Sequence, residues 1–172
     1  MTKAAKKVDI LLGTGNPAKQ VMLAELVEGL PLNPVSPQDI GLDSNPDETA
    51  PSHEEVARDK AAQWSLDSGL LTIASDGGLV IPSLGSKWES LFTHRFAGTS
   101  ATDNDRADEL LKLMSPYEND ARSASWVEAL AIADKGHVLK SWSLEGATGL
   151  IADHTRGNLT DRGFWVFSMW YF

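Results

Sequence analysis

The pattern of hydrophobic and polar positions divides the first part of the chain into strand-like and helix-like segments. An apolar run over residues 8–12 predicts a buried strand, and a Gly-rich turn and a helix with Pro17 in its first turn follow it. Asn16 is placed to cap this helix. The apolar residues of the helix recur at helical spacing: Val21, Leu23, Leu26, Val27 and Leu30. Residues 31–51 are rich in Pro, Asp, Asn and Ser, which predicts a short strand near Val35 and then an extended loop.

A second helix is predicted from Ser52 to Gly69. Its first residues have the capping-box pattern, and Gly69 is a typical helix end. An apolar face runs along it: Val56, Ala57, Ala61, Ala62 and Trp64. The apolar run at 70–74 then predicts a strand, with residues 75–78 (SDGG) as its exit and a further strand at 79–81.

The last segments complete an α/β pattern. A third helix is expected over residues 103–114, capped by Thr102 or Asp103, and residues 123–133 and 138–144 predict a hairpin turned at 134–136. Strand, helix, strand, helix and hairpin together predict an α/β protein with a mixed sheet. The length of 172 residues and the lack of a linker favour a single domain over residues 1–172.

Composition narrows the classes of function. The chain has no cysteine, which excludes disulfides and thiolate metal sites. The net charge of −9 argues against nucleic-acid binding, and an anionic ligand would need a metal ion or a local basic cluster. The apolar run at 8–12 is too short for a signal or membrane segment, so we expect a cytoplasmic protein without membrane contact.

The first candidate for chemistry is the loop GTGNPAK, residues 13–19, between the first strand and the first helix. Such a loop can direct backbone N–H groups at a phosphate, and Thr14, Asn16 and Lys19 can add donors and positive charge. It is neither a Walker loop nor GxGxxG. An ordinary capped turn explains the spacing equally well.

The second candidate is a set of acids. Glu48 ends a loop, and Asp76 follows an apolar strand and precedes two glycines that allow close approach of a ligand. Mg²⁺ takes oxygen ligands from one or two carboxylates and from substrate phosphates, and a nearby carboxylate can orient or deprotonate water. Glu55 and Asp59 share a helix face, but a solvated pair is favoured there.

Other polar residues are less specific. The four histidines show no metal-ligand spacing and are expected at the surface or in packing, and GxSxG is absent. Lys60 could reach a phosphate, although a surface lysine is the simpler expectation. Arg95 lies between two aromatics near an expected strand end and could bind an anion or pair with an acid.

Taken in order, these motifs resemble the inosine triphosphate pyrophosphatase family, which hydrolyses non-standard purine nucleoside triphosphates. The segment 14–19 resembles the family's TGNxxK loop, and DETAPSHEEVARDKA at 47–61 is similar to ETGxTFxENAxxKA. The segment 74–79 (ASDGGL) resembles ADDSGL, and HRFAG with ATDND resembles ARYAG with ATDxxN. The segment 122–134 resembles RTAxFxCALALAD. The similarity runs from Val8 to about Gly163.

The resemblance implies roles for individual residues. Asp76 would orient or deprotonate the attacking water, and Glu48 with Asp76 would hold Mg²⁺. The remaining implied residues would bind the substrate: Thr14, Gly15, Asn16, Lys19, Lys60, Gly77, Arg95 and Phe164. The implied reaction splits a nucleoside triphosphate into monophosphate and pyrophosphate. The implied fold is an elongated α/β domain with helices on both sides of the sheet and a cleft between two lobes, in a homodimer.

The chain departs from the family pattern near these residues. Ser75 replaces an acid, Gly77 replaces a serine, His53 replaces a phenylalanine and Val56 replaces an asparagine. GFWVFSMW at 163–170 replaces the base-reading GFGYDP, which leaves the base preference open.

The apolar run at 164–172 favours a buried strand or a dimer contact over a stacking wall for a base. Alternatives to the hydrolase are a non-catalytic nucleotide-binding protein on the same scaffold, an interaction module that uses the Trp-rich tail, and a phosphatase acting on a phosphosugar.

Overall fold

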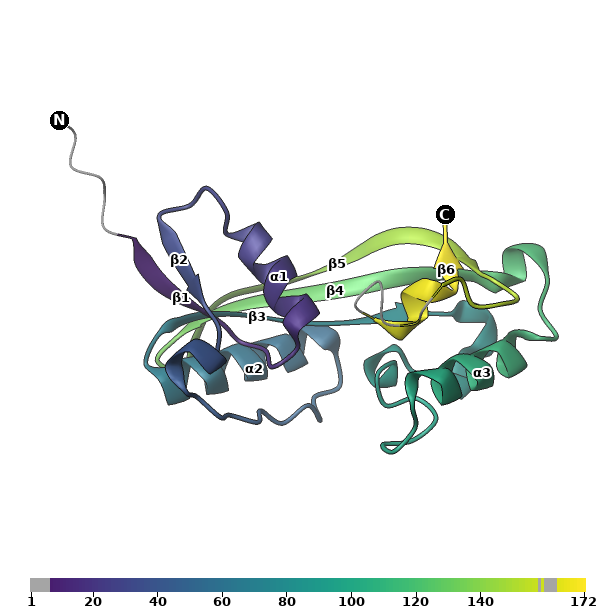
Figure 1. The fold of residues 1–172 in the computed structure, drawn as a ribbon, viewed down its shortest axis with the longest axis horizontal. Helices are drawn as coiled ribbons and strands as arrows, with labels where there is room; N and C mark the ends of the chain where they lie inside the picture. Colours follow the sequence, from purple (N-terminus) through teal and green to yellow (C-terminus); the bar gives the residue numbers. More distant parts are fainter. Residues whose placement is uncertain (1–6, 158, 160–163) are drawn as a thin grey trace. The chain divides into compact units, whose positions relative to one another are not determined.

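The computed structural model describes residues 7–157, 159 and 164–172, and these form a mixed sheet with helices (Figure 1). The strands are β1 (Val8–Leu12), β2 (Leu32–Val35), β3 (Leu71–Val80), β4 (Ser123–Asp134), β5 (His137–Ile151) and β6 (Trp170–Tyr171). The α-helices are α1 (Pro17–Leu26), α2 (His53–Ser68) and α3 (Asp103–Met114). Short 3-10 helices are η1 (Gln38–Ile40), η2 (Pro82–Lys87), η3 (Ser90–Phe92), η4 (Asn119–Arg122) and η5 (Trp165–Ser168).

The strand order is β2-β1-β3-β4-β5-β6. β1 is parallel to both β2 and β3, whereas β5 and β6 are antiparallel. The predicted α/β class with a mixed sheet is therefore confirmed. The chain divides into two compact units, the first made of Met1–Asp76 and Ala129–Ser143, the second of Gly77–Glu128 and Leu144–Phe172.

In the first unit, α1 and α2 cover opposite faces of the sheet. Successive side chains of a strand point to opposite faces, so neighbours on β3 and β4 contribute to different clusters. The cluster with α1 contains Ile10, Leu12, Leu23, Val27 and Ile73, with Leu130 and Ile132 packed against it. The cluster with α2 is made of alanines: Ala57, Ala61, Ala74, Ala129, Ala131 and Ala133. These small side chains let α2 lie close to the sheet.

The predicted helix starts, and the end of α2 at Gly69, are confirmed by their capping bonds, whereas α1 ends at Leu26, before the predicted helical residues Val27 and Leu30. The Asn16 side chain accepts from the N–H groups of Ala18 and Lys19, and the Ser52 side chain accepts from that of Glu55. Gly69 ends α2 with φ of 69°, in the left-handed region that favours glycine. Thr102, and not Asp103, is the cap of α3.

The predicted exit of the central strand is wrong. β3 runs without a break from Leu71 to Val80, so Ser75, Asp76 and both glycines lie inside one strand. Packing against β4 explains why a glycine lies inside this strand. A Cβ at position 77 would lie 2.8 Å from the Val127 carbonyl oxygen and closer still to the Glu128 carboxylate. Gly77 therefore allows the neighbouring strand to lie close, and it does not form a turn.

The second unit has its own core, in which the aromatic C-terminal segment is packed. This segment was expected to form a buried strand or a dimer contact, and it forms η5 and then only two residues of strand. Trp165 and Val166 are fully buried among residues of α3 and β3, and the Trp170 indole donates to the Ala124 carbonyl at 3.1 Å. Trp165, Val166 and residues 168–170 therefore belong to the core, whereas Tyr171 and Phe172 are exposed.

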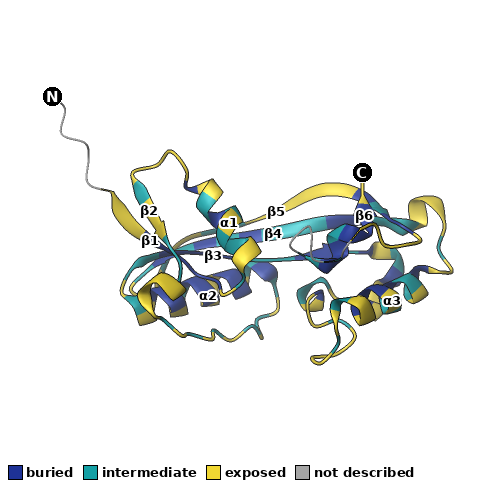
Figure 2. Cartoon of the chain, viewed as in Figure 1, coloured by how far each residue is buried: buried dark blue, intermediate teal, exposed yellow. Residues whose placement is uncertain are grey.

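The hairpin of β4 and β5 is confirmed, with Lys135 and Gly136 at positive φ in the turn. β5 continues to Ile151, beyond the predicted end at 144, and most of it is exposed, as its yellow colour in Figure 2 shows.

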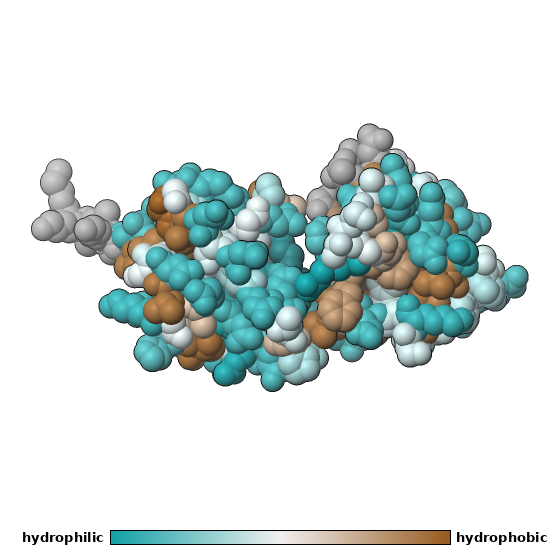
Figure 3. All heavy atoms as spheres, turned by 90° about the horizontal axis from the view of Figure 1, so that it is seen from below, coloured by the Kyte–Doolittle hydropathy of each residue, from teal (hydrophilic) through white to brown (hydrophobic). Residues whose placement is uncertain are grey.

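On the face seen in Figure 3, apolar residues lie scattered among hydrophilic ones. None of the described helices is long and apolar enough to cross a membrane.

Candidate active site

The site in the first unit begins where β1 ends and β3 continues. Leu12, the last residue of β1, pairs with Ile73 in the parallel register, and the Gly13 N–H donates to the Ile73 carbonyl at 2.8 Å. A Cβ on Gly13 would lie 2.9 Å from the Thr72 Cγ2 and 3.2 Å from the Ile73 carbonyl oxygen, so a side chain here would have to displace its neighbours. The carboxyl ends of parallel strands are the usual place for a ligand in α/β sheets.

The loop uses most of its own backbone donors. The Thr14 N–H donates to the Leu12 carbonyl, and the Asn16 N–H donates to the Thr14 Oγ1 at 3.2 Å. Asn16 Oδ1 accepts the N–H groups of Ala18 and Lys19, at 2.9 and 3.4 Å. None of the loop's hydrogen bonds to described residues uses the Gly15 N–H. A phosphate here would therefore rely mainly on side chains.

Gln20 supports the loop and was not singled out from the sequence. Its Nε2 donates to the Thr14 carbonyl and to the Gln38 Oε1, each at 2.9 Å. These two bonds join the first turn of α1, the loop and η1. Nothing in the residue type marks Gln20 in advance, because its role depends on the position of η1.

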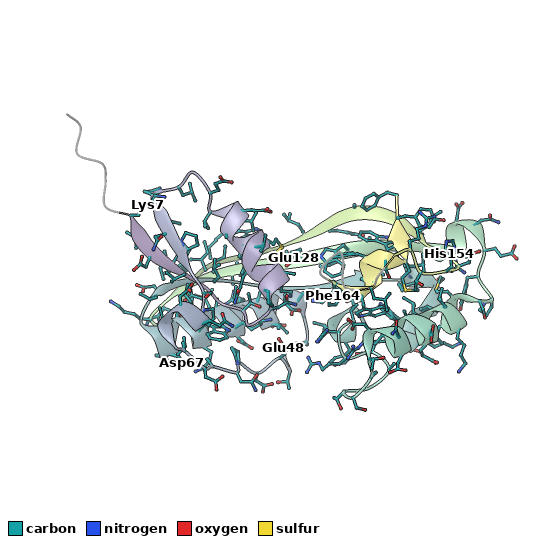
Figure 4. The ribbon with its side chains drawn as sticks, in the orientation of Figure 1. Lys7, Glu48, Asp67, Glu128, His154 and Phe164 are labelled. Atoms are coloured by element: carbon teal, nitrogen blue, oxygen red, sulfur yellow. The ribbon has the colours of Figure 1, made fainter. Side chains whose placement is uncertain are left out.

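Glu48, Lys60 and Asp76 form an ion-paired cluster. The Lys60 Nζ lies 3.0 Å from the Glu48 Oε1 and 3.7 Å from the Asp76 Oδ1. Glu48 comes from the loop before α2, where Figure 4 labels it. Lys60 is only 7% exposed, so the expectation of a surface lysine is wrong. A buried ammonium requires such partners.

His53 completes this cluster. Its Nδ1 lies 2.6 Å from the Asp76 Oδ2, and the histidine is 8% exposed. His53 and Lys60 are two helical turns apart on the buried face of α2, beside Ala57 and Ala61. The helical period could have placed His53 on this face, although it could not have identified Asp76 as its partner.

The donor set of this cluster fits a hard divalent cation. Glu48 and Asp76 already direct oxygen atoms at one positive group, the Lys60 ammonium. The described residues contain no group of three or more His, Asp or Glu side chains arranged as a complete metal site. Two carboxylates with substrate phosphates and water are the usual surroundings of Mg²⁺. The residues therefore fit Mg²⁺ bound together with a phosphate ligand.

Neighbouring acids and hydroxyls lie apart from the cluster. Glu55 and Asp59 are exposed on α2, which confirms that they are solvated. Ser75 alternates with Asp76 and so points to the other face of β3. Its hydroxyl is fully buried, with no hydrogen-bond partner among the described residues.

The other predicted substrate-binding residues belong to the second unit. Gly77 lies against Glu128, whose Oε2 also accepts from the Trp126 indole at 2.8 Å. Arg95 lies in a turn after η3, not near a strand end as expected, with its guanidinium 5.5 Å from the centre of the Phe92 ring.

Phe164 is half-buried in an aromatic group of the second unit. Its ring centre lies 5.9 Å from that of His94 and 5.7 Å from that of Trp126. Figure 4 labels both Phe164 and Glu128.

Comparison with known proteins finds a matching family, similar proteins and a similar solved structure. Residues 10–166 match the Ham1 family. Over 149 residues the chain is 32% identical to a dITP/XTP pyrophosphatase of Thermoanaerobacter sp. strain X514, covering 86% of this chain and 73% of that protein. A dITP/XTP pyrophosphatase of Photorhabdus laumondii is 35% identical over 117 residues, 68% of this chain and 58% of the relative. The structure of a HAM1 protein from Coxiella burnetii aligns with a TM-score of 0.79 and 27% identity, over 95% of this chain and 81% of the other.

Proposed function

The chain belongs to the Ham1 family, and on that premise we propose that it hydrolyses nucleoside triphosphates with non-standard purine bases to the monophosphate and pyrophosphate. The observation that carries the proposal is the cluster in which Glu48 and Asp76 direct carboxylate oxygens at Lys60. Asp76 of this cluster lies on β3, the strand beside β1, past the point where β1 ends and the TGNPAK loop begins. The names of the relatives supply the class of substrate.

The loop after β1 is proposed to hold the triphosphate. The Gly15 N–H, the Asn16 side-chain amide and the Thr14 hydroxyl can donate to phosphate oxygens, while Asn16 Oδ1 caps α1. Lys19, in the first turn of α1, adds positive charge, and so does the amino-terminal end of the helix. These donors offset part of the repulsion between an anionic substrate and a chain of net charge −9.

Glu48 and Asp76 are proposed to hold Mg²⁺ with the substrate. A bound Mg²⁺ ion neutralises charge on phosphate oxygens and so favours attack by water. Lys60 lies between the same two carboxylates and can pair with phosphate instead, because its ammonium is a flexible point charge with three donors.

Asp76 is proposed to act on the attacking water. The carboxylate accepts one proton as the water oxygen forms a bond to phosphorus, and the bond from phosphorus to the pyrophosphate oxygen breaks. Its Oδ2 is occupied by His53, which leaves Oδ1 as the oxygen that faces the cationic side of the cluster.

For Phe164 and Arg95, both in the second unit, the family resemblance supports a role in substrate binding. Phe164 presents part of an aromatic ring, and such rings stack on purine bases. The proposal includes a homodimer, which the family resemblance supports, and a location in the cytoplasm.

The proposal is tested with a nucleotide panel. The protein is incubated with Mg²⁺ and with ATP, GTP, dITP, ITP and XTP, and the release of pyrophosphate is followed. We expect turnover of dITP, ITP and XTP at rates well above those of ATP and GTP. No turnover of any nucleotide would overturn the proposal. Binding of a nucleotide in calorimetry without turnover would instead identify a non-catalytic binding protein on the same scaffold.

A further inference from the structure

His53 contacts the proposed catalytic carboxylate directly. The Nδ1 to Asp76 Oδ2 distance of 2.6 Å is short for a nitrogen–oxygen hydrogen bond. The side chains are 8% and 13% exposed, so little water competes for this contact. Hydrogen bonds to an ionised group are shorter and stronger than those between neutral groups, particularly where water is excluded.

The chemistry of the pair fixes its direction. An ionised carboxylate has only acceptor oxygens, so the proton of this bond belongs to the imidazole Nδ1. The torsion that turns a carboxylate about its Cβ–Cγ bond is broad and sets no orientation by itself. The bond from His53 to Oδ2 therefore determines where Oδ1 points, and Oδ1 is the oxygen on the side of Lys60.

The position of His53 makes it a rigid donor. It is the first residue of α2, directly after the cap Ser52, and the alanine contacts of this helix hold it close to β3.

We propose that His53 is a positioning residue that holds the Asp76 carboxylate in the orientation required for attack by water. This inference rests on the proposed function, because it assigns His53 to the same reaction. Residues that orient a metal-binding or catalytic side chain typically contribute about 10–100-fold to affinity or activity. His53 acts through Asp76 and does not contact the reacting atoms.

The kinetic test compares three variants. His53→Phe keeps a buried ring and removes the donor, and we expect kcat to fall about 10–100-fold with a much smaller change in KM. His53→Asn places an amide nitrogen near the position of Nδ1, and we expect it to recover most of the lost kcat. His154→Phe is the matched control, because the His154 Nδ1 lies at the same 2.6 Å from Asp153, but with side chains 65% and 84% exposed.

A spectroscopic test does not depend on turnover. In a protein with ¹⁵N-labelled histidine, the His53 Nδ1 should carry an exchange-protected, downfield-shifted proton. Asp76→Asn should remove or strongly shift this signal, whereas Asp153→Asn should not.

The outcomes separate the two proposals. Unchanged kcat in His53→Phe, or equal losses in His53→Asn and His53→Phe with intact folds, would overturn the positioning role. An unprotonated Nδ1 in the NMR spectrum would overturn it as well. Absence of turnover in the unsubstituted protein, with the Nδ1 proton present, would refute the pyrophosphatase activity and the positioning role of His53, while leaving the hydrogen bond established.

Discussion

Both oxygens of the Asp76 carboxylate face side chains from one face of α2. His53 lies at Oδ2 and Lys60 at Oδ1, and Lys60 also reaches Glu48. An isolated acid between an apolar run and two glycines suggested either a turn or a site. The structure rejects the turn, since Asp76 lies within β3. A carboxylate held from both sides on a strand is better suited to orienting a water molecule than one on a loop.

Gly77, the residue after Asp76, lies too close to β4 for a side chain, and substitution tests this packing. In Gly77→Ser the new side chain meets the Glu128 carboxylate and the Val127 carbonyl, so the free energy of unfolding should fall by about 1–3 kcal/mol. Urea denaturation measures this change. Gly15→Ser is the control, because no atom lies within 4 Å of a Cβ at position 15. Equal stability of Gly77→Ser and the unsubstituted protein would contradict the close approach of Glu128 and the Val127 carbonyl to this position.

At the scale of elements, α2 and β3 together supply three of the four cluster residues. α2 contributes His53 and Lys60, β3 contributes Asp76, and the loop before α2 contributes Glu48. The alanine contacts between α2 and the sheet bring the helix close to β3. Disturbing this packing should therefore affect the cluster even where no cluster residue is changed.

α3 provides a test of helix capping in the second unit. Thr102 and Asp105 form a capping box, and the Thr102 hydroxyl, followed by its backbone N–H, holds the pKa of the Asp105 carboxyl below its ordinary value of 3.8. Thr102→Ala should lower the free energy of unfolding by about 1 kcal/mol at neutral pH, whereas Thr102→Ser should have little effect.

The sign of the pH dependence follows from this lowered pKa. The folded state holds the Asp105 proton more weakly than the unfolded state, so the stabilisation is present above pH 3.8 and is lost as the pH falls through the folded-state pKa. The difference between Thr102→Ala and the unsubstituted protein should therefore shrink in urea titrations below pH 3.8. A difference that grows in acid would contradict the capping box.

The sequence predicted the elements with strong local signals and failed where distant contacts decide. Caps at Asn16, Ser52 and Gly69 depend on neighbouring residues, and all three were correct. The break in β3 was wrong because two glycines favour a turn locally, whereas Glu128 on another strand explains Gly77. The extent of β5 and the form of the C-terminal segment likewise depend on packing across the second unit.

The candidate site was predicted only in part, again because contacts between distant residues decide which side chains meet. Glu48, Asp76 and the loop after β1 were named from motifs, and the structure brings Glu48 and Asp76 to one ammonium. Lys60 was named, but its burial was not foreseen. His53 was expected only at the surface or in packing, because a single histidine has no signal until its partner is known.

At the scale of the whole molecule, the charge of the chain opposes its proposed substrate. A net charge of −9 repels a triphosphate, and two carboxylates lie within the site itself. The proposed divalent cation would remove this conflict, because such ions take oxygen ligands from both carboxylates and phosphates.

Removal of the metal should therefore abolish turnover of dITP. Chelation with EDTA is expected to stop pyrophosphate release, and excess Mg²⁺ should restore it. Glu48→Gln should raise the Mg²⁺ concentration required for half-maximal activity by about 10-fold or more. Glu55→Gln, on the exposed face of α2, should not. Full activity in EDTA would show that the carboxylates serve another purpose.

The central claim is that Asp76 is the carboxylate that acts on the attacking water. The most direct test measures the rate of pyrophosphate release from dITP with saturating Mg²⁺ for the unsubstituted protein, Asp76→Asn and the exposed control Asp59→Asn. We predict that Asp76→Asn lowers kcat by about 10²–10⁴-fold with an unchanged fold, while Asp59→Asn retains full activity. A kcat for Asp76→Asn close to that of the unsubstituted protein would contradict the claim.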